Sequence, residues 1–255
     1  MPTQLATARI PTLTDLNTSE VSPEEFYALS TDETGTTPQT VYRLQDINAD
    51  GDANDPGEAT IVAQLPSGVV VNTIAVDANQ NVWFVGNPGT DSLPGGDLYW
   101  IHDGTPALVF AGATLLSQLN LTVNAYKLDT YAGSVVFHGI EGTTPGDFLS
   151  GSVLVELRDA NGDGQITIDE VQTIWSYTTG DFWSGFYDLR GLEDGSIIAL
   201  GNDGYMLRLV DTNQDGDFLG EGETYVTYDN TFATNDGQTP GDQNGFFSMT
   251  ASTKL

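Results

Sequence analysis

The sequence predicts an all-β fold, and within that class a β-propeller with four blades. Short runs rich in β-branched and aromatic residues recur between Gly, Asn, Asp and Pro. The runs group in fours, and matching runs lie ~50–60 residues apart, which is typical of propeller blades. Three acidic loops of one pattern also fall at the same place in three of the four groups.

The expected strands are arranged as one incomplete set followed by three complete sets. Apolar residues occupy both faces of a run such as 82–86, which suits sheets that pack face to face. No run shows sustained helical periodicity. In order, the runs are 25–30, 40–44 and 60–65; 69–77, 81–86, 97–102 and 107–111; 121–129, 134–139, 152–158 and 171–175; and 182–192, 196–201, 205–210 and 224–228.

The first set lacks an inner strand, and two segments could supply it. One is residues 244–250, which resembles 184–190, and the other is residues 10–16. We therefore divide the chain into an N-terminal arm, residues 1–25, and a propeller, residues 26–255, closed by the C-terminal strand. A strand left over could stay on its own subunit, or it could add to the sheet of a neighbouring copy and build an open filament.

Each acidic loop has the pattern D-x-N-x-D-G and joins the third expected strand of a blade to the fourth. Oxygen atoms at loop positions 1, 3 and 5 can converge on one cation, glycine at position 6 allows a sharp turn, and the carbonyl at position 7 adds a ligand. In the remaining blade the same connection is the short turn at Asp103 and Gly104. The sequence therefore predicts about three Ca²⁺ ions at outer hairpins.

The loops differ in how the ligand shell closes. The second has Glu170 at position 12, where a bidentate carboxylate is expected. The first and third have Gly57 and Gly222 there, with Glu58 and Glu223 one residue later, so their closing ligands are less certain. Plain turn chemistry would also favour Asp, Asn and Gly. The predicted ligands are Asp46, Asn48, Asp50, Asp52, Glu58, Asp159, Asn161, Asp163, Gln165, Glu170, Asp211, Asn213, Asp215, Asp217 and Glu223.

Charge and composition argue against several classes of binding partner and site. The formal net charge is −29, from 36 acidic and 7 basic residues, which argues against nucleic acid and against anionic membrane surfaces. No apolar run is long enough to insert in a membrane. The absence of cysteine excludes disulfides and thiolate sites.

The loops resemble those of dockerin and thrombospondin type 3 modules, and Asp159–Glu170 also resembles an EF-hand loop without its helices. With the strand repeats, the chain resembles a bacterial extracellular β-propeller with calcium inserts. The resemblance implies calcium, secretion and a surface or matrix setting. No signal peptide is recognisable at the start of the chain, so the export route stays open.

We expect a structural role: a secreted or cell-surface module stabilised by calcium, able to assemble with itself by strand exchange. One alternative is an adhesin head that binds a surface glycan or protein. Another is a calcium-dependent hydrolase of phosphoesters or lactones. No catalytic motif is present, and His102 and His138 stand apart from any recognisable nucleophile, so an enzyme is the less expected reading.

Overall fold

The computed structural model describes residues 13–18, 25–30, 38–50, 52–77, 79–88, 96–123, 127–131, 133–141, 151–163, 165–177, 186–192, 194–201 and 205–229. The chain divides into two compact units, Met1–Ser92 with Gly96–Ala111, and Leu93–Gly95 with Gly112–Leu255. Among the described residues, no helix has the length and apolarity needed to span a membrane.

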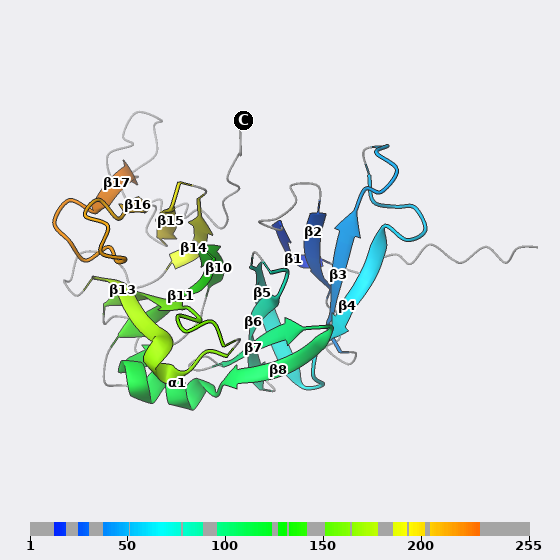
Figure 1. Cartoon of the computed structure of the whole chain (residues 1–255), viewed down its shortest axis with the longest axis horizontal. Helices are drawn as coiled ribbons and strands as arrows, with labels where there is room; N and C mark the ends of the chain where they lie inside the picture. Colours follow the sequence, from blue (N-terminus) through cyan, green and yellow to red (C-terminus); the bar gives the residue numbers. More distant parts are fainter. Residues whose placement is uncertain are drawn as a thin grey trace, which may run out of the picture. The chain divides into compact units, whose positions relative to one another are not determined.

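The first unit contains two antiparallel sheets, each with four strands in chain order (Figure 1). Sequential up-and-down pairing of this kind is the arrangement of a propeller blade. The first blade contains β1 (Leu13–Thr18), β2 (Glu25–Ser30), β3 (Thr40–Gln45) and β4 (Ala59–Gln64). The second contains β5 (Val69–Val76), β6 (Val82–Pro88), β7 (Asp97–His102) and β8 (Thr105–Phe110).

The second unit contains two more sheets of the same order. The third blade contains β10 (Leu128–Tyr131), β11 (Ser134–Glu141), β12 (Ser152–Leu157) and β13 (Val171–Tyr177). A short strand, β9 (Leu121–Val123), pairs with β11, and a 3₁₀ turn, η1 (Ile168–Glu170), precedes β13. The fourth blade contains β14 (Phe186–Gly191), β15 (Ser196–Gly201), β16 (Tyr205–Val210) and β17 (Thr224–Asp229).

Apolar side chains on facing sheets form a core in each unit. In the first unit, Leu29 and Val41 pack with Phe84 of the second blade, and all three are fully buried. In the second unit, Leu154 and Ile174 pack with residues of the fourth blade. Burying one such side chain stabilises the fold by about 1.5–3 kcal/mol. Apolar residues on the faces of the middle strands therefore stabilise the packing of neighbouring sheets.

Every blade carries a β-bulge at a similar place, in its outermost strand opposite the second to fourth residues of the third strand. Adjacent residues of the third strand pair with residues two apart in the outer strand, which leaves one extra residue unpaired in the ladder. The extra residues are Val62, Val109, Ile174 and Thr227. The four blades thus share a local irregularity as well as a strand order.

The predicted fold class, an all-β β-propeller with four blades, is confirmed by these sheets. The expected strand at 121–129 is wrong, because it divides into β9 and β10 and follows a helix, α1 (Gly112–Leu119). Residues 113–119 contain good helix formers, Leu115 is buried, and Asn120 ends the helix with a φ of 53°.

The N-terminal part of the chain supplies the inner strand that the first set of expected strands lacks. Strand β1 lies inside the segment expected to be an arm and pairs antiparallel with β2 along its length. It therefore occupies the inner position of the first blade in its own chain. The other candidate for this position, residues 244–250, lies outside the described residues, as does the closure expected from it.

Candidate metal centres

The three acidic loops occupy equivalent connections between the third and fourth strands of their blades. They join β3 to β4, β12 to β13, and β16 to β17. In the second blade, Asp103 and Gly104 connect β7 to β8 with φ values of 50° and 73°, a tight turn without an insertion. The predicted placement of the loops is confirmed.

Loop positions 3 and 5 hold the backbone through the same hydrogen bonds in all three loops. In the first loop, Asn48 Oδ1 accepts from the N–H of Asp50 at 2.9 Å, and Asp50 Oδ1 accepts from the N–H of Asp52 at 3.2 Å. Both bonds recur in the other loops, with acceptors Asn161, Asp163, Asn213 and Asp215. The repeated turns orient the side chains of alternate residues to one side.

Position 4 has a left-handed backbone in every loop. The φ values are 61° at Ala49, 73° at Gly162 and 63° at Gln214. A non-glycine residue in this region costs about 1–2 kcal/mol. Two of the three loops therefore hold this conformation in a residue type that disfavours it, which shows that the surrounding hydrogen bonds dictate the loop shape.

The closing glutamates are held alike despite their different spacing. Glu170 accepts at Oε1 from the N–H of Ala160 at 3.1 Å and at Oε2 from the N–H of Thr167 at 2.9 Å. Glu58 accepts from Ile47 and Asp55 at 3.1 and 2.8 Å, and Glu223 accepts from Thr212 and Gly220 at 3.1 and 2.7 Å. Each carboxylate thus joins the second residue of its loop to the residue three before itself.

The extra residue of the longer loops is accommodated before the final turn. Asp52 accepts from the N–H of Asn54 at 2.9 Å, and Asp217 accepts from that of Leu219 at 2.8 Å, which adds one more turn at position 7. The second loop has Gln165 at this position. Asp at position 7 therefore accompanies a closing carboxylate one residue later, and Glu58 and Glu223 remain predicted ligands.

Burial distinguishes the closing carboxylates. Glu223 is fully buried and Glu58 is 2% exposed, whereas Glu170 is partly exposed. Backbone N–H groups, first that of Thr167, hold the pKa of Glu170 below its usual value. N–H donors stabilise the charged form of this carboxylate.

The third loop brings three carboxylates together. One oxygen from each of Asp211, Asp215 and Glu223 lies within 4.8 Å of the other two. Like charges this close repel each other unless a cation lies between them. For the first two loops the described residues give the shared hydrogen bonds, but no such approach of three carboxylates.

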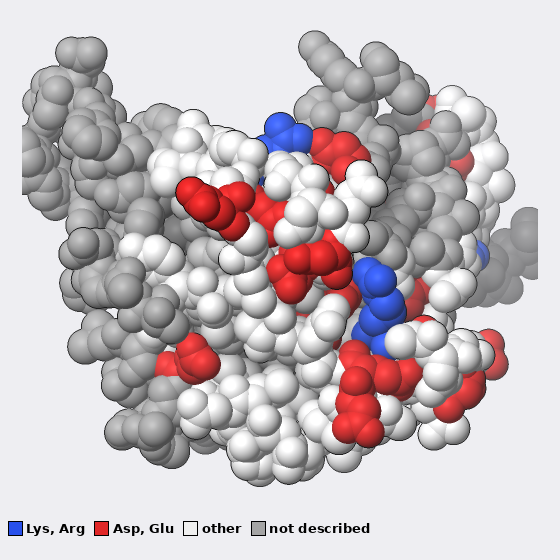
Figure 2. All heavy atoms as spheres, turned by 60° about the vertical axis from the view of Figure 1, so that its left-hand side comes forward, with Lys and Arg blue, Asp and Glu red and all other residues white. Residues whose placement is uncertain are grey.

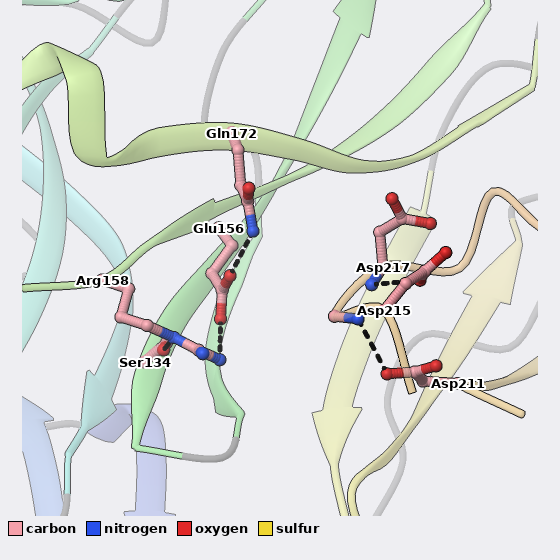
Figure 3. Close-up of polar contacts among 8 residues, drawn as sticks. Ser134, Glu156, Arg158, Gln172, Asp211, Asp215 and Asp217 are labelled. Carbon is pink, nitrogen blue, oxygen red and sulfur yellow. Dashed lines mark hydrogen bonds and ion pairs between the residues drawn. The ribbon is translucent and has the colours of Figure 1, made fainter. Parts of the chain in front are cut away.

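The arginines that precede the loops pair with acids outside them. Arg158 donates to Glu156 at 2.6 Å and to Ser134 at 2.8 Å, as Figure 3 shows beside the separate group of Asp211, Asp215 and Asp217. Arg43 pairs with Glu25, and Arg208 with Asp194. Acidic side chains outnumber basic ones on the face in Figure 2, so a metal cation is a suitable counter-charge for the loops.

Sequence reasoning missed Phe218, at position 8 of the third loop. It is 2% exposed and belongs to the core of the second unit. The equivalent residues, Ala53 and Ile166, are only partly buried. A large aromatic residue inside an acidic loop is the signal that could have revealed this buried contact.

No known protein family matches this sequence, and no curated protein does so either. Solved structures similar to it include a luciferin-regenerating enzyme, with a TM-score of 0.48 and 13% identity over 84% of this chain and 62% of that one. Another is the calcium-binding protein regucalcin from Agrobacterium tumefaciens, with a TM-score of 0.48 and 13% identity over 79% and 57%. This chain spans less than two thirds of the length of either, and the fold assignment rests on the sheet topology.

Proposed function

We propose that this protein is a calcium-binding β-propeller in which three loops, Asp46–Glu58, Asp159–Glu170 and Asp211–Glu223, each bind one Ca²⁺ ion and stabilise their blades. The observation that carries the proposal is the shared position of the closing carboxylate. In every loop it is held by backbone N–H groups from both ends.

The ligand chemistry favours calcium over other cations. Side chains at positions 1, 3 and 5, a carbonyl at position 7 and a carboxylate at the close supply oxygen alone. Ca²⁺ takes six to eight oxygen ligands in flexible geometry, whereas Mg²⁺ demands a near-ideal octahedron and retains water. Three ions would change the formal charge from −29 to −29 + 6 = −23, which reduces repulsion within each loop.

The role of the ions is structural. The second blade makes the same connection with a tight turn, so the long acidic loops are not needed to join the strands. Without a cation their carboxylates repel each other, and the loops would fray from the strands they join. We therefore propose that calcium fastens the outer edge of three blades.

A calcium-rich setting suits this role. Extracellular modules with such loops bind calcium at ~10⁻⁴–10⁻³ M, well above cytosolic concentrations. We propose that the protein works outside the cell or at its surface.

Titration of the chelator-treated full chain with CaCl₂, followed by calorimetry, tests the proposal. We expect three bound ions, and a melting temperature that rises with calcium as mass action requires. Asp159→Asn should leave two ions and lower the melting temperature in calcium but not in chelator. The absence of binding in millimolar calcium would rule out the proposed function.

We also propose that the partner is another copy of the chain, joined by strand addition. Exposed apolar side chains on the outermost strands support this, namely Ile61 in β4, Leu108 in β8, and Tyr225 and Val226 in β17. Light scattering in calcium and in chelator tests it. A monomer under both conditions would exclude self-assembly and direct the work to glycan-array and hydrolase assays.

A further inference from the structure

Loop Asp211–Glu223 contacts the neighbouring blade as well as its own. The N–H of Phe218 donates a 2.7 Å hydrogen bond to the carbonyl of Ile174, the bulge residue of β13. Because a bulge leaves its residue outside the ladder, this carbonyl is available to a partner from another blade. The Phe218 ring packs against Tyr131 with a centroid distance of 5.5 Å.

A second contact lies at the end of the same loop. Trp175, next to Ile174 in β13, donates from Nε1 to Thr224 Oγ1 at 3.0 Å, and Thr224 directly follows the closing Glu223. The bulge of the third blade therefore holds the loop of the fourth blade at its middle and at its end. These bonds span the interface between two sheets of one unit.

In the first unit, a short turn rather than an acidic loop approaches the bulge of the preceding blade. A β-carbon on Gly104, in the turn from β7 to β8, would lie 3.2 Å from the carbonyl oxygen of Val62, the bulge residue of β4. The connection between third and fourth strands thus approaches the bulge of the preceding blade in both units. A rigid turn achieves this in one case and a long loop in the other.

We propose that the third loop is a calcium-controlled clasp between the third and fourth blades. Resting on the proposed function, this inference adds that the ion bound by Asp211, Asp215 and Glu223 keeps Phe218 seated on the bulge at Ile174. When the ion leaves, repulsion among these carboxylates opens the loop and withdraws Phe218 from the core. Calcium at this loop then controls the packing of two blades.

Hydrogen exchange measured by mass spectrometry on the full chain, in calcium and in chelator, tests the clasp. We expect chelation to lower protection about tenfold in β13, outside the loop itself, because the opening exposes its bulge. Asp211→Asn should produce the same loss in calcium. Asp46→Asn, which alters the first loop, should leave β13 protected and serves as the matched control.

Substitution of Phe218 tests directly whether this side chain links calcium binding to the protection of β13. Phe218→Ala should still bind three ions by calorimetry, but protection of β13 should no longer respond to calcium; Phe218→Leu provides a milder variant that preserves the core. Leu219→Ala, an adjacent change at a residue 54% exposed, should behave as wild type. If calcium binds and β13 protection is unchanged on chelation, the clasp is refuted while the metal sites stand; if no calcium binds, both fail.

Discussion

Gly220 lies so close to the closing carboxylate of its loop that a β-carbon on it would come within 2.5 Å of Glu223 Oε2 and 2.8 Å of Cδ. The N–H of Gly220 also donates to that oxygen at 2.7 Å. Glycine at this position therefore lets the backbone reach a buried carboxylate and hold it in place.

Gly220→Ala should weaken calcium binding at the third loop without removing a ligand. The added methyl group displaces the Glu223 carboxylate from its N–H donors, so we expect at least about a tenfold loss of affinity there, equal to about 1.4 kcal/mol. Calorimetric titration measures the loss. Glu221→Ala, an exposed neighbour, is the control; equal affinities for wild type and Gly220→Ala would show that the carboxylate position does not matter.

The shared position of the closing glutamates predicts that each is equally necessary for calcium binding at its own loop. Glu58→Gln, Glu170→Gln and Glu223→Gln should each reduce the number of bound ions from three to two, because the charge and one of the carboxylate oxygens are lost. Glu221→Gln should retain all three. If only Glu170→Gln removed an ion, the one-residue-longer loops would not be metal sites.

The left-handed residue at loop position 4 predicts substitutions of opposite sign. Ala49→Gly and Gln214→Gly should stabilise the protein by about 1 kcal/mol, since glycine adopts this backbone without steric cost. Gly162→Ala should destabilise it by a similar amount, although a β-carbon there would touch nothing within 4 Å. Urea unfolding in saturating calcium, which holds the loops in this conformation, measures each change. Effects of one sign for all three variants would contradict the backbone explanation.

Acid sensitivity should arise in part from His138. It is fully buried in β11, and its Nδ1 has no hydrogen-bond partner among the described residues. Burial lowers its pKa from 6.5 to about 3. His138 therefore binds a proton near pH 6.5 in the unfolded chain but only near pH 3 in the folded chain. The free energy of unfolding falls as the pH falls from about 6.5 to about 3.

His138→Leu should remove this component. Between pH 7 and pH 5, protonation of this histidine in the unfolded chain lowers the unfolding free energy of the wild type by about 2 kcal/mol. The unfolding free energy of the variant should not fall by this amount. Urea unfolding at both pH values, in chelator, makes the comparison, and the carboxylates contribute to both proteins alike. Identical pH dependence would show that His138 is not the titrating group.

Much of the fold follows from local sequence. Runs such as 82–86 and 196–201, bounded by Asp, Asn and Gly, predict strands because β-branched and aromatic residues suit a pleated, buried sheet. The helix at Gly112–Leu119 was missed because it is short and buries few side chains, Leu115 among them, so its periodicity is hardly visible.

The candidate ligands also follow from spacing, since D-x-N-x-D-G specifies which oxygens share a side of the loop. Spacing alone left Glu58 and Glu223 doubtful. The structure shows that backbone N–H groups at both ends of each loop hold these carboxylates as they hold Glu170, because a carboxylate is placed by the donors around it rather than by its distance along the chain. Their role as ligands stays a prediction.

By itself, the sequence determined four sets of strands and three oxygen-rich loops, because strand propensity and turn chemistry act between near neighbours in the chain. Only the tertiary structure decided that Leu13–Thr18 pairs with β2 and that Phe218 joins its loop to the bulge at Ile174. Those contacts link distant or separate elements, and their stability comes from burial and hydrogen bonding that exist only after the sheets have packed.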